Sequence, residues 1–239
     1  MANSASIFNG LNLRAMLPAS KHRRMLAVDV TACLRNAIQR GLLPDGIELN
    51  QVALAEHLGV SRVPVREAMR SLQAEGWISA RANYRATVQA VSAERVKQIF
   101  ELRTLLEVHC LKRAARAMSA DRIKKLSAMC DAMEKMKDHD AWLAANRKFH
   151  RTLLEGPSSE LAIELVEQLT SQVERYLRMG GGGPMRERQA GAEHRAIVKA
   201  LSRRDARKAA DLIRKHIGNT NRVALAVIEA RQRARQRAG

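Results

Sequence analysis

The stretch "LGVSRVPVREAM", residues 58–69, joins a turn to the start of a helix. Gly59 interrupts the helical pattern of the preceding residues, and Ser61 is the predicted N-cap of the next helix, which we expect to reach about residue 75. Pro64 falls in the first turn of that helix, where its missing N–H has no intrahelical partner. A helix, a glycine turn and a second helix form the helix-turn-helix arrangement, whose second helix enters the major groove of DNA.

Two arginines support this interpretation. Arg62 and Arg66 lie one helical turn apart at the start of the predicted helix. The planar fork of arginine pairs with O6 and N7 of guanine, and a good pair discriminates between bases by roughly 1–3 kcal/mol. A pair of surface arginines on an ordinary amphipathic helix is the competing interpretation. The glycine turn, the N-cap and the early proline together favour DNA recognition.

The surrounding pattern predicts a winged helix-turn-helix domain over residues 25–90. A first helix is expected over about 25–40, and the second begins after Asn50, a favourable N-cap. After the third helix, β-prone residues near Ile78 and at 87–88 predict a small two-stranded wing.

The rest of the chain has a helical pattern, so the fold class is mostly α. We expect an antiparallel bundle of about six helices over residues 91–230, with a basic extension at 1–24 and a basic tail at 231–239. The four glycines at 180–183 are predicted to form a flexible connector. A phosphate-binding loop is the alternative, but it needs a preceding strand and a following Lys-Ser/Thr pair, which are missing from the sequence.

Composition narrows the class of protein. Apolar residues make up 46% of the 239 residues and aromatic residues only 3%, which favours packed helices over sheets. The net charge of +18 indicates a polyanionic partner, although charge alone does not distinguish a specific DNA site from nonspecific binding.

Cysteine usage and hydropathy predict a cytoplasmic protein. Cys33, Cys110 and Cys130 are scattered and lack metal-ligand spacing, so we expect reduced thiols. No apolar run approaches the roughly 20 residues of a membrane span, and the N-terminus does not have the pattern of a secretory signal.

The segment "LAEHLGVSRVPVREAMRSLQAEGWI", residues 54–78, is similar to the winged helix-turn-helix signature of GntR-family transcription regulators, and the helical remainder resembles the FCD effector-binding domain of the FadR-like subgroup. The resemblance implies a homodimer that binds a double-stranded DNA operator, with Arg62 and Arg66 reading bases. Arg85 stands where the wing of the family usually has a glycine, so we assign no wing residue. The predicted DNA-binding residues are Ser61, Arg62, Val63, Pro64, Arg66 and Arg70.

Three histidines of the helical region can converge. Asn146 and His150 share one face of a predicted helix, and His194 and His216 lie on two later helices separated by a short break. Three imidazoles and one oxygen donor suit Zn²⁺ or Ni²⁺, whereas unrelated exposed or core histidines are the competing interpretation. His139 and the other histidines receive no functional assignment.

The resemblance to FCD domains favours the metal site. Metal-binding members have an aspartate four residues before the first histidine, and Asn146 replaces that aspartate here. An amide oxygen is neutral, so we expect metal binding that is weaker or that depends on a carboxylate effector. In "FELRTLLE" (100–107), the resemblance implies that Arg103 points into the effector cavity and binds a carboxylate, although a helix-borne arginine is more often solvated.

These observations predict a ligand-responsive transcription regulator, most simply a repressor, that binds a small organic acid through a metal ion. A nonspecific basic nucleic-acid-binding protein is the first alternative. A metalloenzyme is the second, but the sequence around the Asn/His/His/His set offers no carboxylate as a general base, so we expect no turnover. The identities of the effector, the metal and the operator do not follow from the sequence.

Overall fold

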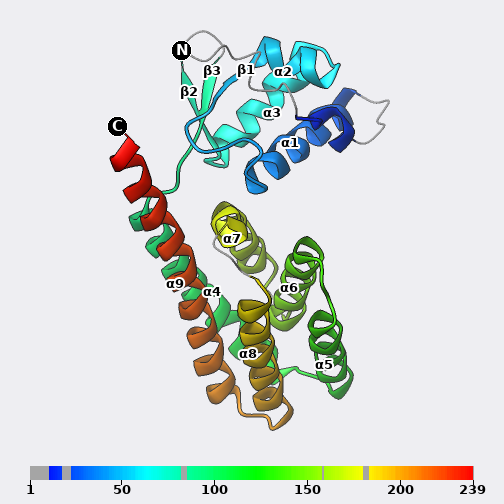
Figure 1. Ribbon diagram of the computed structural model, residues 1–239. Coiled ribbons are helices and arrows are strands. Elements are labelled where there is room, and N and C mark those ends of the chain that lie inside the picture. Colours follow the sequence, from blue (N-terminus) through cyan, green and yellow to red (C-terminus); the bar gives the residue numbers. More distant parts are fainter. Residues whose placement is uncertain (1–10, 18–22, 82–84, 158, 180–182, 239) are drawn as a thin grey trace. The chain divides into compact units, whose positions relative to one another are not determined.

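The chain consists of two compact units, Met1–Ala90 and Val91–Gly239, each with a hydrophobic core of its own. The computed structural model describes residues 11–17, 23–81, 85–157, 159–179 and 183–238 (Figure 1). Most of the predicted basic extension 1–24 and the first three glycines of the predicted connector 180–183 lie outside these ranges.

The first unit combines helices with one small sheet. Its elements are the 3-10 helix η2 (Leu13–Met16), α1 (Arg23–Gln39), β1 (Glu48–Asn50), α2 (Gln51–Leu58), α3 (Arg62–Ala74), β2 (Ile78–Arg81) and β3 (Arg85–Val88). The predicted wing has two strands, but the sheet has three, in the antiparallel order β1-β3-β2. Glu48 of β1 pairs with Thr87 of β3. The extra strand is only three residues long and forms through a partner distant in sequence, so local patterning did not indicate it.

Local signals fix the helix-turn-helix. The side chain of Asn50 accepts hydrogen bonds from the first N–H groups of α2. Gly59 ends α2 with a φ of 67°, a left-handed conformation that glycine adopts without steric cost. Ser61 occupies the N-cap position of α3, but its side chain makes no capping hydrogen bond. At the other end of α3, the carboxylate of Glu75 accepts two hydrogen bonds from Arg35 of α1, which anchors the helix to the unit.

Within its described residues, the second unit contains helices alone, six of them, which confirms the predicted bundle of about six helices. These are α4 (Ala93–Arg116), α5 (Ala120–Glu134), α6 (His139–Leu154), α7 (Glu160–Met179), α8 (Pro184–Ser202) and α9 (Ala206–Ala238). Helix α4 packs along α9 and against α7, and α5 packs against α6 and α8 (Figure 1). The predicted basic tail 231–239 is not a separate segment, because α9 continues through Ala238. Arginine, glutamine and alanine are strong helix formers, which explains the longer helix.

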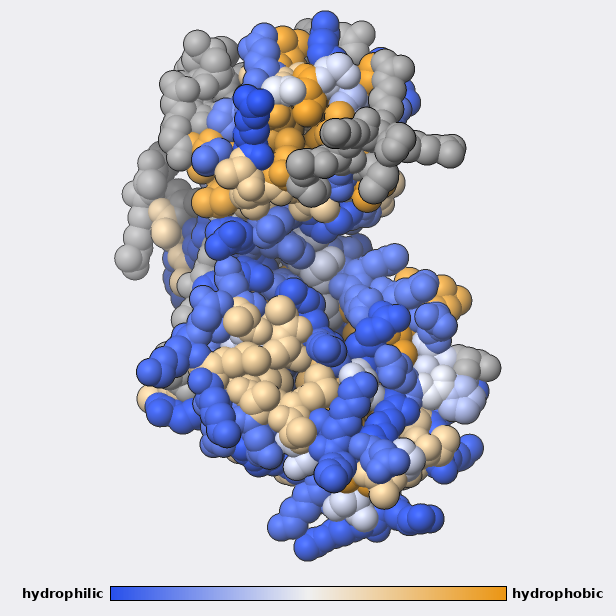
Figure 2. All heavy atoms as spheres, turned by 90° about the vertical axis from the view of Figure 1, so that its right-hand side faces the viewer, coloured by the Kyte–Doolittle hydropathy of each residue, from blue (hydrophilic) through white to orange (hydrophobic). Residues whose placement is uncertain are grey.

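Hydrophilic side chains cover most of the second unit on the face shown in Figure 2, where they surround one patch of moderately hydrophobic residues. Among the described helices, none combines the length and the apolar character needed to cross a membrane.

Candidate functional site

The outer face of α3 presents three arginines in a row. Arg62, Arg66 and Arg70 are all exposed and lie at four-residue spacing, so they share one side of the helix. Within the described ranges, no ion pair or hydrogen bond engages their guanidinium groups. Ser61 is also exposed at the start of the same face. The helix therefore offers a polyanion an unobstructed row of positive charges beside its N-terminus.

Two predicted DNA-binding residues are less accessible. Val63 is half-buried, and Pro64 is buried in the first turn of α3. The inner face of the helix, which includes Val65 and Leu72, belongs to the core of the unit. Because Pro64 is buried, its ring is not available to a ligand. Its role is to fix the start of α3.

The second unit brings three of the predicted site residues together. His150 comes from α6, His194 from α8 and His216 from α9. Each offers a ring nitrogen, and the three nitrogens all lie within 4.8 Å of one another. All three side chains are buried, and His194 has no exposed surface. Their convergence is the arrangement expected for ligands of a single metal ion.

Two carboxylates lie beside the imidazoles. Nδ1 of His216 lies 2.6 Å from Oε2 of Glu193, and Nδ1 of His150 lies 3.3 Å from Oε2 of Glu107. At His216 the carboxylate favours a proton on Nδ1 and leaves Nε2 as the free lone pair, as is common behind metal-bound histidines. Nδ1 of His150 and Oε2 of Glu107 lie close together but do not form a hydrogen bond with each other. Neither glutamate was predicted from the sequence. The signals available were the four-residue spacing of Arg103 and Glu107 and the position of Glu193 beside a candidate ligand.

The histidine cluster has unsatisfied nitrogens. Both ring nitrogens of His194 are buried, and no hydrogen-bond partner occurs for them among the described residues. Burial, reinforced by the nearby His216 and His150, holds the pKa of His194 well below its usual value. Burial likewise lowers the pKa of His216 to about 4. Neutral imidazoles with free lone pairs are the form that binds a metal, so these residues fit a divalent ion.

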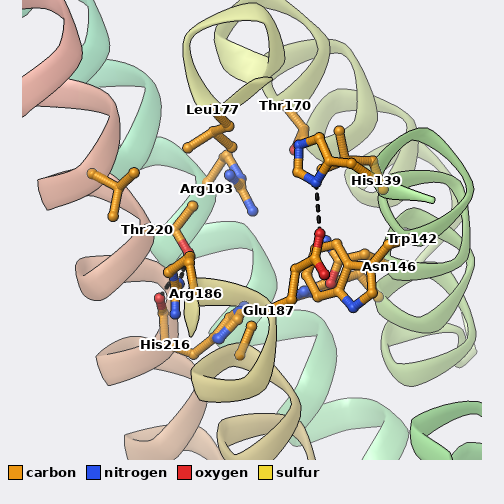
Figure 3. Close-up of a pocket in the computed structure, with 14 residues that line it drawn as sticks. Arg103, His139, Trp142, Asn146, Thr170, Leu177, Arg186, Glu187, His216 and Thr220 are labelled. Carbon is orange, nitrogen blue, oxygen red and sulfur yellow. Dashed lines mark hydrogen bonds and ion pairs between the residues drawn. The ribbon is translucent and has the colours of Figure 1, made fainter. Parts of the chain in front are cut away.

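Asn146 adds an oxygen to this cluster. It lies one turn before His150 on α6 and lines the same cavity as His150 and His216 (Figure 3). Its Oδ1 is buried and has no hydrogen-bond partner in the part of the chain that the structure describes. An unsatisfied buried carbonyl oxygen in a residue that lines the same cavity as two of the imidazoles is a candidate fourth donor.

A cavity of about 70 Å³ opens beside the cluster (Figure 3). Arg103 of α4 lines it, with only 5% of the residue exposed, and both Nε and Nη2 donate to Oε1 of Glu107 at 3.0 and 2.7 Å. Although burial alone would raise the pKa of Glu107, Arg103 and His150 lower it to about 2, so this carboxylate stays charged. Arg103 thus lies at the wall of a cavity, and its contact with an effector stays a prediction.

Further polar groups of the cavity were not predicted from the sequence. Arg186 of α8 reaches Oγ1 of Thr220 at 2.8 Å and Oε2 of Glu193 at 3.4 Å. On another wall, Nδ1 of His139 lies 2.7 Å from Oε1 of Glu187 (Figure 3). Each of the two guanidinium groups is paired with a carboxylate, Arg103 with Glu107 and Arg186 with Glu193, and both can offer further N–H donors to a small anion.

Comparison with known proteins identifies the family. Residues 26–88 match the gntR family of bacterial regulatory proteins, and residues 98–219 match the FCD domain. The chain belongs to the GntR family, with the FCD domain that the resemblance predicted. Members of this family bind DNA operators, so the protein is a transcription regulator and not an enzyme.

Individual relatives agree. The chain is 31% identical over 127 residues to an HTH-type transcriptional regulator of Agrobacterium vitis, which covers 51% of this chain and 74% of that protein. It is 25% identical over 191 residues to the gluconate operon transcriptional repressor of Bacillus licheniformis, with 77% and 78% covered. The solved structure of Escherichia coli McbR/YncC has the same fold, with a TM-score of 0.70, 21% identity and coverage of 83% of this chain and 96% of that chain.

Proposed function

We propose that this regulator is a homodimeric repressor that leaves its operator when a small carboxylate binds beside a divalent metal ion in the second unit. The observation that carries the proposal is the buried triad of His150, His194 and His216, which lies against a cavity lined by Arg103 and Arg186. A buried histidine cluster in which both ring nitrogens of His194 lack a hydrogen-bond partner among the described residues has little purpose in a purely structural core.

The arginine row of α3 supplies DNA recognition in this proposal. Arg62 and Arg66 occupy the N-terminal turns, the part of a recognition helix that contacts base edges. Arg70, one turn further, is suited to a phosphate. Ser61 keeps its hydroxyl free for a second phosphate because it makes no capping hydrogen bond. The exposed part of Val63 can contact a thymine methyl group.

The cavity supplies effector recognition. His150, His194, His216 and Asn146 would hold Zn²⁺ or Ni²⁺, and the bound ion would act as a Lewis acid toward a carboxylate. Arg103 is held in place by Glu107, so its remaining N–H can donate to an anion without first losing rotamer freedom. Arg186 also lines the cavity and would be a second donor to the anion.

One hydrogen bond connects the cavity to the start of the second unit. The N–H of Val91, the first residue of that unit, donates to the hydroxyl of Tyr176 at 2.8 Å. Tyr176 lies on α7, and the same helix contributes Thr170 and Leu177 to the cavity wall. Suppose that an effector binds one conformation of the second unit better than another, and that α7 differs in position between the two. The effector would then increase the population of the favoured conformation, and the contact of α7 with Val91 would carry the change to the start of this unit.

Exposed leucines support a homodimer. Leu102 and Leu105 on α4 are 49% and 68% exposed, and Leu161 and Leu165 on α7 are 70% and 40% exposed. These two helices pack against each other, so the leucines form part of one unit's surface. Exposed large apolar side chains on two neighbouring helices are a common feature of interfaces, and a two-fold dimer matches the symmetry of a palindromic operator.

Arg66→Ala tests the DNA-binding half of the proposal. An operator is first selected from random duplexes with the unaltered protein, and affinities are then measured for it and for a scrambled duplex. We expect the variant to lose roughly 1–3 kcal/mol of discrimination, about tenfold to a hundredfold. Lys97→Ala, which removes an exposed charge from α4, should leave the ratio unchanged. If the Arg66 variant preferred the operator over the scrambled duplex as strongly as the unaltered protein does, Arg66 would not read a base. Equal affinity of the unaltered protein for every duplex would instead support nonspecific binding.

A further inference from the structure

We infer that Arg14, in the segment that precedes α1, is a further DNA-binding residue: it binds a backbone phosphate beside the turn of the helix-turn-helix. This segment, residues 11–17, lies before residues 26–88, which match the gntR family, and none of the predicted DNA-binding residues belongs to it. The inference rests on the proposed role of α3 in DNA binding. It adds a contact that would fix the position of that helix on the duplex.

The segment around Arg14 is anchored to the first unit. Leu13 is fully buried in the core of the unit, and Met16 and Leu17 are partly buried against the same core. The carbonyl oxygen of Leu13 accepts a hydrogen bond from Sγ of Cys33 on α1 at 3.4 Å. Because these contacts hold the backbone of Arg14, a bond made by its side chain costs less conformational entropy than one made by a free tail.

The side chain of Arg14 reaches the turn between α2 and α3. A Cβ added to Gly59 would lie 3.2 Å from Cζ of Arg14 and 3.4 Å from its Nε and Nη1, so the guanidinium group lies against the glycine. Gly59 ends α2 and stands two residues before Ser61, the N-cap of α3. Two residues span at most about 7 Å, so the positive charge of Arg14 is close to the end of α3 that carries Arg62.

The guanidinium group of Arg14 has its donors available. The residue is exposed, and within the described ranges its side chain forms no hydrogen bond or ion pair. Arg35 of the same unit differs, because it donates two hydrogen bonds to Glu75 and so joins α1 to the end of α3. Arg14 can therefore donate to an anion, as can Arg62 and Arg66.

The docking geometry of a helix-turn-helix indicates which anion this is. The second helix enters the major groove, and the first helix crosses the sugar-phosphate backbone. The turn that joins them therefore lies where the protein passes from the backbone into the groove. Base edges are contacted by the first residues of the second helix, so a guanidinium group beside the turn is placed for a phosphate oxygen.

A structural role is the competing explanation for Arg14. A cation near the C-terminal end of a helix interacts favourably with the helix dipole, and Gly59 ends α2. That role would appear in the stability of the first unit and not in its affinity for DNA. The two roles can therefore be separated by experiment.

Arg14→Gln tests the inference in the full chain. Affinities for the selected operator and for a scrambled duplex are measured at several salt concentrations, well below the thermal unfolding midpoint of each protein. One phosphate contact contributes about 0.9 to the slope of log affinity against log salt, so the slope should fall by about that amount for each bound copy of the chain. Both duplexes should lose affinity by the same factor, about fivefold to tenfold per copy at about 0.1 M salt, because a phosphate contact does not depend on sequence.

Two variants serve as controls. Arg14→Lys keeps the charge and should retain the salt slope and most of the affinity, because lysine also binds phosphate. Arg207→Gln removes one charge from an exposed position of α9 and should leave the slope unchanged.

Modified operators locate the phosphate. In a set of duplexes, each carries one uncharged methylphosphonate in place of a backbone phosphate. We expect one position at which this replacement weakens binding of the unaltered protein and has no effect on Arg14→Gln, because both changes remove the same contact.

The other outcomes overturn the inference. If Arg14→Gln keeps its affinity and salt slope, Arg14 does not bind DNA, and a lower unfolding midpoint would assign it the structural role at the end of α2. A loss of affinity for the operator alone would make Arg14 a base-reading residue and contradict the phosphate contact. Arg66→Ala tests the proposed function separately: if it loses discrimination while Arg14→Gln binds normally, only the inference fails, and if both bind normally, the role of α3 fails as well.

Discussion

The two units place their candidate functional side chains in opposite environments. On α3, Arg62 and Arg66 are exposed and unpaired among the described residues. In the helical unit, His194 and His216 are buried, and Arg103 is buried and held by a carboxylate. The proposed function explains the difference by the size of the ligand that each unit would bind. A duplex is too large to enclose, so its reader must protrude, whereas a small anion is bound strongly only where water is excluded and charges are less screened.

The same contrast appears along the chain. One contiguous stretch, residues 61–70, contains the DNA-binding residues predicted from the sequence. The candidate effector site draws on α4, α6, α8 and α9. We therefore expect changes on α3 to act on DNA binding alone, and changes in the cavity to affect ligand binding without altering the recognition helix.

The largest expected effect is that of His194→Ala. Removing one of three nitrogen donors should weaken Zn²⁺ binding by more than about a hundredfold, because even residues behind a ligand commonly contribute ten- to a hundredfold. Affinity of the metal-free protein for its selected operator should stay within about twofold. Chelator competition and DNA titration measure the two quantities. His109→Ala, at an exposed position of α4, is the control. Unchanged Zn²⁺ affinity in the His194 variant would contradict the assignment of a metal site to the buried histidines of the second unit.

A smaller effect is expected at the exposed leucines of the helical unit. The double substitution Leu105→Glu and Leu161→Glu should raise the dimer dissociation constant by about tenfold to a hundredfold, because each copy would bury charge in place of apolar surface. Sedimentation at several protein concentrations measures this constant. Val28→Glu, at a position that is 68% exposed in the first unit, should leave it unchanged. If only the Val28 variant dissociates, the dimer interface belongs to the DNA-binding unit.

The smallest expected effect concerns the thiols, which report on each unit separately. Burial raises the pKa of Cys33 in the first unit and of Cys130 in the second to about 11, so both should react slowly with a thiol reagent at neutral pH. Operator DNA should slow the modification of Cys33 a few-fold, and Zn²⁺ with glycolate, a small carboxylate, should slow that of Cys130, as mass spectrometry of the labelled peptides can measure. Equal protection of both thiols by either ligand would show that the units open together.

Local signals in the sequence predicted much of the fold. The N-cap at Asn50, the glycine turn at Gly59 and the start of α3 after Ser61 all lie where the residue types indicated. These features depend on hydrogen bonds and backbone conformations within a few residues, so the sequence alone can predict them. The strand β1 and the full length of α9 escaped prediction. The strand β1 forms only by pairing with residues distant in sequence. The helix α9 continues through a basic segment whose composition also suits a solvated tail.

The sequence by itself determined the class of protein: a helix-turn-helix with an arginine-bearing second helix, followed by a helical bundle that carries histidines at suggestive positions. Only the tertiary structure decided that three of those histidines meet within 4.8 Å, that Glu107 and Glu193 lie beside them, and that Asn146 and Arg186 complete the cavity. The physical reason is packing. The rotation and depth of each helix in the bundle are set by side chains from several other helices, and spacing along one helix contains no information about which groups face each other across a core.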